Sequence, residues 1–291
     1  MSVQSIYQMS WWRDLQEVVR PTRGAALALR SRVLLYAASP LFNGKAPQEV
    51  ITALVDKNGR QLLSSTYDES KWAKAAAAAP DVIELGRYQL HVAYQRDYSS
   101  LAYPKTITPP DDNGTFHSNP WPNGWEDIDP FESYRSLFDG SVNIYNNNEL
   151  IFSRGLSQGS ENIEVMVIHQ LPRSQGGGYN CHGMTQKQCD AYYMNNGEDC
   201  PGMNDMYKGK EGYTDPSRYN KDPRPAGVIE AKELEDYPEL GSKGAGVSRQ
   251  YAHREPRFYA SVGYNGSVWH MLSANEKDNE EHDVQIFYYR G

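Results

Sequence analysis

The sequence predicts a mainly α-helical protein with paired helices, long loops and a few short strands. Two Ala-rich segments of strong helix formers, residues 22–40 and 68–86, lie in the first third of the chain. A stretch with six prolines and two Asn-Gly pairs follows at residues 98–130, and long proline-rich loops of this kind are often functional. We therefore divide the chain into a helical segment, residues 1–97, and a loop-rich region with short helices and a β-hairpin, residues 98–291.

The first helix is predicted between Thr22 and Pro40. Thr22 can act as the N-cap, and Pro40 excludes helix from Ser39 onward. Apolar residues surround this helix on nearly all sides, and such helices are normally buried on several sides. We therefore expect it to need helical neighbours.

The second helical segment is centred on Ala73–Ala79. Asp68 or Ser70 can cap its start, and Gly86 suits the left-handed position just after a helix. Pro80 lies inside the pattern, so the helix is expected either to kink there or to restart.

Shorter elements follow from the placement of turn residues between apolar runs. We expect a short helix at 131–139, a strand at 149–154, a glycine-rich loop at 170–182, a short helix at 186–193, a loop at 195–228, a hairpin formed by 253–262 and 267–269 around a turn at 263–266, and a final strand at 284–289.

Composition excludes several classes of function. The chain holds 29 Lys and Arg against 37 Asp and Glu, so its formal charge is −8. An acidic chain lacks the basic footprint of a nucleic-acid binder and is repelled by anionic lipid unless it has a local basic patch. It has no apolar run long enough for a transmembrane helix. Neither a Walker loop nor a G-x-S-x-G motif is present, so no cofactor is predicted.

Aromatic residues are unusually frequent, with 6 Trp, 21 Tyr and 7 Phe. Tyrosine and tryptophan combine an apolar ring with a polar tip, which suits recognition of flat polar groups such as sugar rings. The alternative is that the tyrosines line the edge of a large core, and composition does not separate the two.

Six segments follow one another along the chain: TRGAALALRSRVLLYAASPLFNG from Thr22, residues 72–88, Tyr134–Phe138, Glu149–Arg154, Met184–Tyr192 and residues 254–269. In their sequence and their order they resemble the SusD/RagB family. The resemblance implies tetratricopeptide-like helix pairs that support a loop-rich glycan site. It implies a non-catalytic lipoprotein on the cell surface, in the outer membrane, that hands oligosaccharides, or peptides in some members, to a SusC-like TonB-dependent transporter.

The chain departs from the family pattern at both ends. No lipoprotein signal or lipidated cysteine is visible at its start, and the helices that flank these segments in the family are missing. We therefore expect an internal portion of a longer protein, whose membrane contact runs only through a lipid anchor outside this chain. We also expect lower stability than its length suggests, with apolar surface exposed.

Trp121 and Trp125 are candidate ligand contacts in the proline-rich loop. Their rings can stack on pyranose faces while the amides of Asn119 and Asn123 bond hydroxyls. The alternative is that the tryptophans anchor a long loop to the core.

Tyr179 and Asn180 form a second candidate, because they follow three glycines that let the backbone approach a ligand closely. Arg173 and His169 are near in sequence, and the resemblance places this region on the ligand-facing side. Weaker candidates are Tyr213, with Tyr207 and Tyr219, and Trp269, which is a better core residue.

The remaining chemistry-bearing residues give weaker patterns. The chain has three cysteines, Cys181, Cys189 and Cys200, and no C-x-x-C pair, so a zinc site is poorly supported. Two alternatives stay open for them: one disulfide, Cys189–Cys200, or three free thiols. Asp127 or Asp129 would serve as acid or base if the protein were a glycoside hydrolase. A further rival is a protein-interaction scaffold that docks the transporter.

Overall fold

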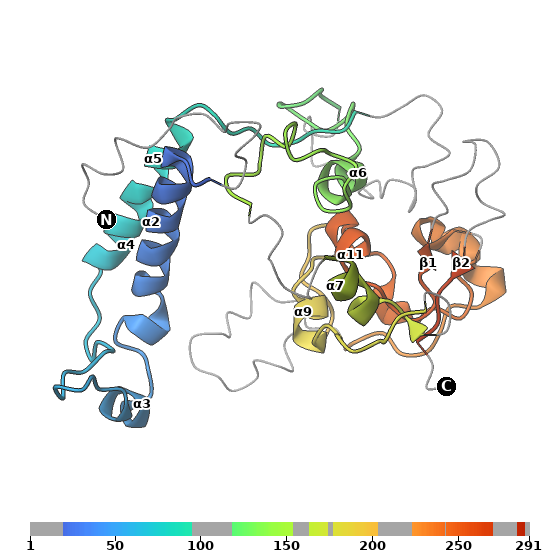
Figure 1. Cartoon of the computed structure of the whole chain (residues 1–291). Helices are drawn as coiled ribbons and strands as arrows, with labels where there is room; N and C mark the ends of the chain where they lie inside the picture. Colours follow the sequence, from blue (N-terminus) through green and yellow to red (C-terminus); the bar gives the residue numbers. More distant parts are fainter. Residues whose placement is uncertain are drawn as a thin grey trace. The chain divides into compact units, whose positions relative to one another are not determined.

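The computed structural model describes residues 20–94, 118–153, 163–173, 177–202, 223–241, 243–269 and 284–288 (Figure 1). The chain separates into two compact units. Unit 1 comprises Met1–His91 with Asn143–Leu156, and unit 2 comprises Val92–Val142 with Ser157–Gly291. The sequence-based division at residues 97 and 98 stays a prediction.

Helices far exceed strands in the described residues, which confirms the predicted mainly α fold. Unit 1 holds α2 (Arg23–Ala38), η1 (Pro40–Phe42), α3 (Gln48–Ala53), α4 (Ser70–Ala78) and α5 (Pro80–Ile83). Unit 2 holds α6 (Pro130–Arg135), α7 (Ile163–Gln170), α9 (Gln186–Asp190), η2 (Ala231–Asp236), η3 (Pro238–Leu240), η4 (Arg249–Tyr251), α11 (Pro256–Ser261), β1 (Val268–Trp269) and β2 (Val284–Gln285). Within these ranges, no helix combines the length and apolar character needed to cross a membrane.

The ends of α2 are set by local sequence, as predicted. The Thr22 hydroxyl accepts a hydrogen bond from the Ala25 N–H at the start of α2, and the helix stops before Ser39 and Pro40. The second segment restarts at Pro80 as α5, and Gly86 has a φ of +59°. These capping residues act over one turn, so the sequence alone locates them. The predicted cap of α4 is wrong: its N-cap is Glu69, which makes no side-chain cap bond, and Asp68 accepts from the Ser70 N–H at 2.9 Å.

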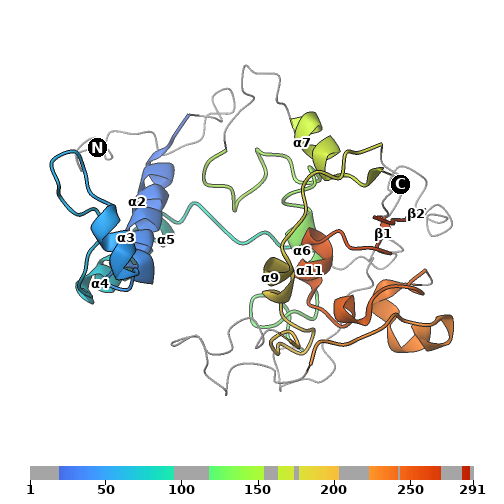
Figure 2. The same cartoon turned by 90° about the horizontal axis from the view of Figure 1, so that it is seen from below.

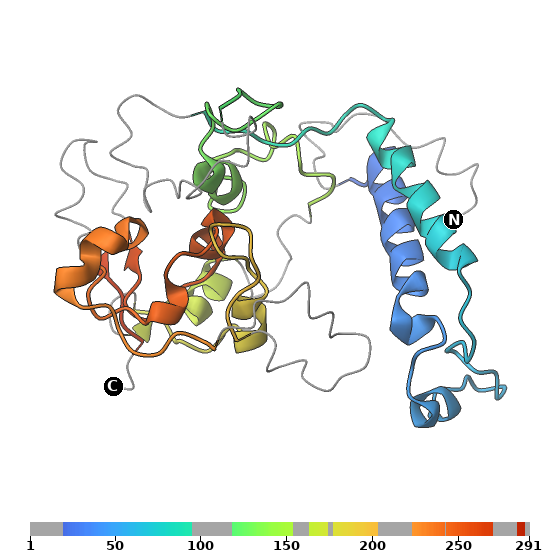
Figure 3. The same ribbon diagram turned by 180° about the vertical axis from the view of Figure 1, so that it is seen from behind.

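Helices α2 and α4 run side by side in opposite directions, and Figure 3 shows the same pair from behind. Asn43 is fully buried at their connection. Its amide donates to the carbonyls of Ala38 and Asp68 at 3.3 and 3.0 Å, and its oxygen accepts from the Asp68 N–H at 2.8 Å. The end of one helix is thereby tied to the start of the next.

Within the described residues helix α2 is buried on one side and not on several, which agrees with the expectation that this chain exposes apolar surface. Its buried residues are Gly24, Leu27 and Ala38. Leu29 and Val33 are 56% and 57% exposed, because α4 covers only one side of the helix. The need for further neighbours, which the apolar pattern indicates, is therefore unmet in the described part of unit 1.

Phe258 lies at the centre of the unit 2 core with none of its surface exposed. The rings of four tyrosines lie within 6.0 Å of it, centroid to centroid, namely Tyr192, Tyr251, Tyr259 and Tyr264. The cluster also contains Cys189, Ile229, Leu240, Val247, Ala252 and Val262. Helix α6 packs beside α11, as Figure 2 shows from below. For these tyrosines the alternative of lining a core is correct.

The predicted hairpin is wrong in its first strand. Residues 256–261 form helix α11, with Pro256 at its first position, where the missing N–H is no loss. The turn at Gly266 is confirmed, with a φ of +86°. Strand β1 then pairs antiparallel with β2, so that Val268 faces Gln285. The final strand is confirmed only for Val284–Gln285.

Two further differences concern short elements. Residues 149–153 form no strand, because the Asn147 side chain accepts from the N–H groups of Glu149 and Leu150 and holds a turn there. Helix α7 was not predicted. The helices predicted at 131–139 and 186–193 are confirmed but shorter, as α6 and α9.

Candidate ligand-binding site

The loop after α7 folds back onto the carbonyl end of that helix. Five backbone N–H groups of the loop donate to carbonyls near the helix end: Gly178 to Pro172, Tyr179 to Ile168, Asn180 to Leu171, and both Cys181 and His182 to His169, at 2.8–3.3 Å. The last carbonyls of a helix lack partners within the helix, so this return satisfies them. Residues 177–182 are thus held in one conformation by the helix.

Glycine is required at one point of this loop. A Cβ atom on Gly178 would lie 2.2 Å from the Leu171 carbonyl oxygen. Asn180 has a φ of +47°, a region that asparagine tolerates better than most residues. Gly178 therefore serves the close approach of two backbone segments.

Three rings meet on the outer side of the loop. The His169 centroid lies 5.4 Å from that of Tyr179 and 5.4 Å from that of His182. Tyr179 is 52% exposed, and Asn180 and His182 are exposed too. The loop thus combines an exposed aromatic ring, an exposed asparagine and two imidazoles, of which that of His169 is half-buried. We call these four residues the Tyr179 cluster.

Of the other residues predicted to contact a ligand, some lie within the described residues and some lie outside them. Arg173 is exposed, three residues beyond the end of α7. Tyr213, Tyr207 and Tyr219 lie outside the described residues, and so does the side chain of Trp269. Within the described ranges, no group of three or more His, Cys, Asp or Glu is arranged to hold a metal ion.

The loop segment that contains Trp121 and Trp125 forms a series of turns closed by hydrogen bonds within the segment. The Trp121 N–H donates to Asp127 Oδ1 at 2.8 Å, and the Glu126 N–H donates to the Asn119 carbonyl at 3.1 Å. Trp121, Trp125 and Asn119 are half-buried, whereas Asn123 is exposed. Half-buried indoles fit a sugar-stacking role and an anchoring role equally, so both alternatives stay open.

The two acids that a hydrolase would need have structural tasks. Asp127 accepts from the Trp121 N–H, and Asp129 is buried and caps α6 by accepting from the Glu132 N–H at 3.0 Å. Carboxylates committed to backbone N–H groups are typical of turns and helix starts. Asp127 therefore closes a turn, and Asp129 caps a helix.

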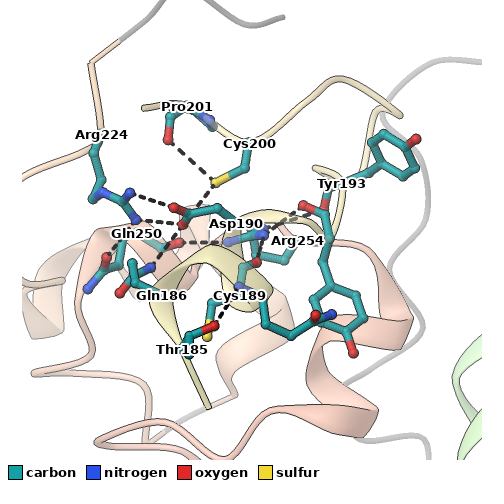
Figure 4. A network of polar contacts seen from close by, with 12 residues as sticks. Thr185, Gln186, Cys189, Asp190, Tyr193, Cys200, Pro201, Arg224, Gln250 and Arg254 are labelled. Carbon is teal, nitrogen blue, oxygen red and sulfur yellow. Dashed lines mark hydrogen bonds and ion pairs between the residues drawn. The ribbon is translucent and has the colours of Figure 1, made fainter. Parts of the chain in front are cut away.

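A buried polar network surrounds Asp190 at the end of α9 (Figure 4). Asp190 is fully buried and accepts two hydrogen bonds from Arg224, each of 2.6 Å, one from Gln186 at 2.9 Å and one from the Cys200 thiol at 4.0 Å. Burial alone would raise the pKa of Asp190, but the bonds from Arg224 and Gln186 outweigh it and lower the pKa below its ordinary value.

Arg254 completes this region from the core side. It is 1% exposed and donates to the carbonyls of Cys189 and Tyr192 at 2.6 and 2.7 Å, with its guanidinium 4.4 Å from the Phe258 centroid. The guanidinium therefore joins the end of α9 to the aromatic core.

All three cysteines are free thiols, so the alternative of a Cys189–Cys200 disulfide is wrong. Burial raises the pKa of the Cys189 and Cys200 thiols, which keeps them protonated and unreactive.

Sequence reasoning missed two of these features. The contact of His182 with His169 depends on helix α7, which was not predicted; the three glycines before Tyr179 were the signal that the chain returns. The Asp190–Arg224 pair joins residues 34 positions apart, and only the i, i+4 spacing of Gln186 and Asp190 pointed to a polar site on α9.

Comparison with known proteins identifies the family. Residues 146–290, about half of the chain, match the model of the SusD family. The chain belongs to the SusD/RagB family, as the resemblance implied, and the matched part contains the Tyr179 cluster and the unit 2 core. Family members are generally non-catalytic binding proteins, which supports a general role in nutrient or glycan binding.

One solved structure supports the fold. The chain resembles the structure of BT4246 with a TM-score of 0.52 and 22% identity, covering 92% of this chain and 41% of that one. A structure of selenomethionine BT4246 matches with a TM-score of 0.43 and 22% identity, covering 86% of this chain and 39% of that one. The chain thus spans about two fifths of their length. A search of the curated proteins finds no match.

Proposed function

We propose that this chain belongs to a cell-surface protein of the outer membrane, held there by a lipid anchor, that binds oligosaccharides or polysaccharides without cleaving them. The bound glycan passes to a SusC-like TonB-dependent transporter. Family membership supports the general role. The observation that carries the proposal for this chain is the exposed Tyr179 cluster on a loop that five backbone hydrogen bonds hold in place.

The cluster has the chemistry of a sugar site. A pyranose ring presents an apolar C–H face that stacks on an aromatic ring, and its hydroxyls bond amide and imidazole groups. Because the loop is already ordered, binding loses little conformational entropy. The half-buried Trp121 and Trp125, with Asn119 and Asn123, provide a second candidate surface for a long glycan.

Affinity electrophoresis through gels containing soluble polysaccharides tests the proposal. Tyr179→Ala should weaken retardation by roughly tenfold in apparent Kd, the loss expected for one stacking contact. Tyr145→Ala is the matched control, because Tyr145 is 50% exposed and lies in unit 1. New reducing ends in the same mixtures would favour a hydrolase instead.

A protein-interaction scaffold makes the opposite prediction. If the chain only docks the transporter, Tyr179→Ala and Trp121→Ala leave glycan retardation unchanged. Retardation by peptides and not by any polysaccharide would assign the site to peptide capture, as in some family members.

A further inference from the structure

A short antiparallel bridge in unit 2 has one face turned to the core and one turned outward. Met194 pairs with Arg254 in this bridge. Arg254 is 1% exposed, and its guanidinium donates to the carbonyls of Cys189 and Tyr192, so its side chain faces the core. Side chains alternate between the two faces of such a pair. The residues on either side of the bridge therefore share the outward face: Tyr193, Asn195, His253 and Glu255.

Hydrogen bonds across the bridge bring two exposed rings close together. The Asn195 N–H donates to the His253 carbonyl at 2.7 Å. The Glu255 N–H donates to the Tyr193 carbonyl at 3.0 Å. Tyr193 is 45% exposed, and so is the side chain of His253. The two rings are diagonal neighbours across an antiparallel pair, a separation that aromatic side chains can span.

His253 is held in an unusual backbone conformation. Its φ is +54°, which a residue other than glycine seldom adopts. Glu239 is 4% exposed; its Oε1 accepts from the His253 N–H at 2.6 Å and lies 3.4 Å from Nδ1. The Tyr237 ring stacks on the imidazole with centroids 4.9 Å apart, and Arg249 donates to the Tyr237 hydroxyl at 2.8 Å. Conformations of this kind persist only where the surroundings impose them, and they are frequent at ligand sites.

We propose that Tyr193 and the His253–Tyr237 stack form a second saccharide-binding surface, which takes a neutral sugar; this inference rests on the proposed function. We call these three residues the His253 surface. The C–H face of a pyranose stacks on such rings, and its hydroxyls bond imidazole and amide groups. Because Nδ1 of His253 faces Glu239, a sugar hydroxyl would bond Nε2. The stack is already fixed by its neighbours, so binding loses little conformational entropy.

The charges beside the His253 surface favour a neutral ligand. Arg257 pairs with Glu255 at 2.6 Å, and Arg249 pairs with Glu233 at 2.6 Å. A carboxylate or sulfate on the ligand would compete with these two carboxylates for the guanidinium groups and would be repelled by them. A hydroxyl group needs no such exchange.

Removal of each ring tests the surface. Tyr193→Ala and His253→Asn are compared with wild type and Tyr179→Ala in gels containing amylopectin, dextran, galactomannan or arabinoxylan, with polygalacturonate as the anionic polymer. Asparagine tolerates a positive φ, so His253→Asn removes the ring and keeps the backbone conformation. For the neutral polymer that retards wild type, we expect each variant to raise the apparent Kd about two- to tenfold. Tyr67→Ala, at a site 56% exposed in unit 1, is the control and should cause no change.

Chemical labelling locates the bound sugar on the unmodified sequence. Diethyl pyrocarbonate labels exposed imidazoles, and mass spectrometry reads His253 and the two histidines of the Tyr179 cluster on separate tryptic peptides. The retained neutral polysaccharide should lower labelling of His253 at least twofold. In Tyr193→Ala this protection should be weaker at the same polymer concentration.

The failure of this inference can be told apart from the failure of the proposed function. If Tyr179→Ala weakens retardation while Tyr193→Ala, His253→Asn and the labelling of His253 show no effect, the proposed function stands and the His253 surface is refuted. If Tyr193→Ala weakens retention of polygalacturonate and of no neutral polymer, the neutral class is wrong. Loss in Tyr193→Ala with none in Tyr179→Ala would support the His253 surface alone. Absence of retardation of the folded chain in every gel would reject both proposals.

Discussion

At the scale of single residues, the Asp190 carboxylate is buried and still charged. Removal from water disfavours the charged form of Asp190, whereas hydrogen bonds from Arg224 and Gln186 stabilise that form. A buried charge of this kind is tolerable only while its partners remain, and loss of one partner leaves the other uncompensated.

Asp190→Asn should lower the free energy of unfolding by about 3 kcal/mol at pH 7, because Arg224 loses its anion. Since folding lowers the Asp190 pKa, its contribution is present above the unfolded pKa of about 3.9 and is lost as pH falls through the folded value. Urea unfolding at pH 7 and pH 3 should therefore show a smaller difference between wild type and variant at pH 3. Asp236→Asn, at an exposed site, is the control. If the unfolding free energies of wild type and variant differ by the same amount at pH 7 and pH 3, Asp190 is not the charged group that we describe.

Gly178→Ala tests whether the return of the loop positions the Tyr179 cluster. The added Cβ would meet the Leu171 backbone at 2.2 Å, so the loop must shift, at a loss of about 1–3 kcal/mol in stability. We expect glycan retardation to weaken as far as in Tyr179→Ala. Gly183→Ala is the matched control, since no atom lies within 4 Å of its Cβ position and its φ needs no glycine. Full retardation by folded Gly178→Ala would show that the loop geometry is unimportant.

At the scale of elements, the sequence predicted those set by neighbouring residues. Helix α2 carries its cap at Thr22 and its stop at Pro40, and α5 begins at Pro80. The strand expected at 253–262 was wrong because its apolar residues are compatible with either a strand or a helix, and Phe258 lies in the core on helix α11. The partner of β1 lies beyond residue 280, and no local pattern reveals such pairing.

The candidate site was predictable in its residues and not in its arrangement. Tyr179 and Asn180 were singled out from the glycines before them, and both are exposed. Their contact with the end of α7 depends on a helix whose apolar run has no clear period. The ring contacts of His169 follow from that helix, so they too required the structure.

Helix α2 gives a prediction about its uncovered face. Leu29→Gln with Val33→Gln should reduce fluorescence of the dye ANS and change stability by less than about 1 kcal/mol in total, because both side chains are more than half exposed. Leu27→Ala, at a site only 8% exposed, should instead lose about 2–4 kcal/mol. Unchanged dye binding in the polar variant, or a loss as large as that of Leu27→Ala, would show that this face is covered in solution.

At the scale of the whole molecule, the two units differ in how their described residues bury apolar surface. Unit 1 buries few apolar residues, and half of them are alanines: Leu27, Ala38, Ile51, Leu63, Ala75 and Ala78. Unit 2 buries Phe258, Tyr264, Leu240 and Ile229 in one cluster. Because hydrophobic stabilisation scales with buried apolar area, unit 1 gains less from its core than unit 2 does.

Hydrogen exchange should resolve this difference residue by residue. Local stability follows burial, so amides within α2 should exchange roughly tenfold or more faster than those of Ile229 and Val262, whose N–H groups bond Val247 and Phe258 inside the unit 2 cluster. The measurement is mass-spectrometric exchange on the intact chain at neutral pH. Phe258→Leu provides the control, because a smaller residue in the unit 2 core should accelerate exchange there and leave α2 unchanged. Protection of α2 equal to that of the cluster would mean that α2 is covered on more sides than α4 alone provides.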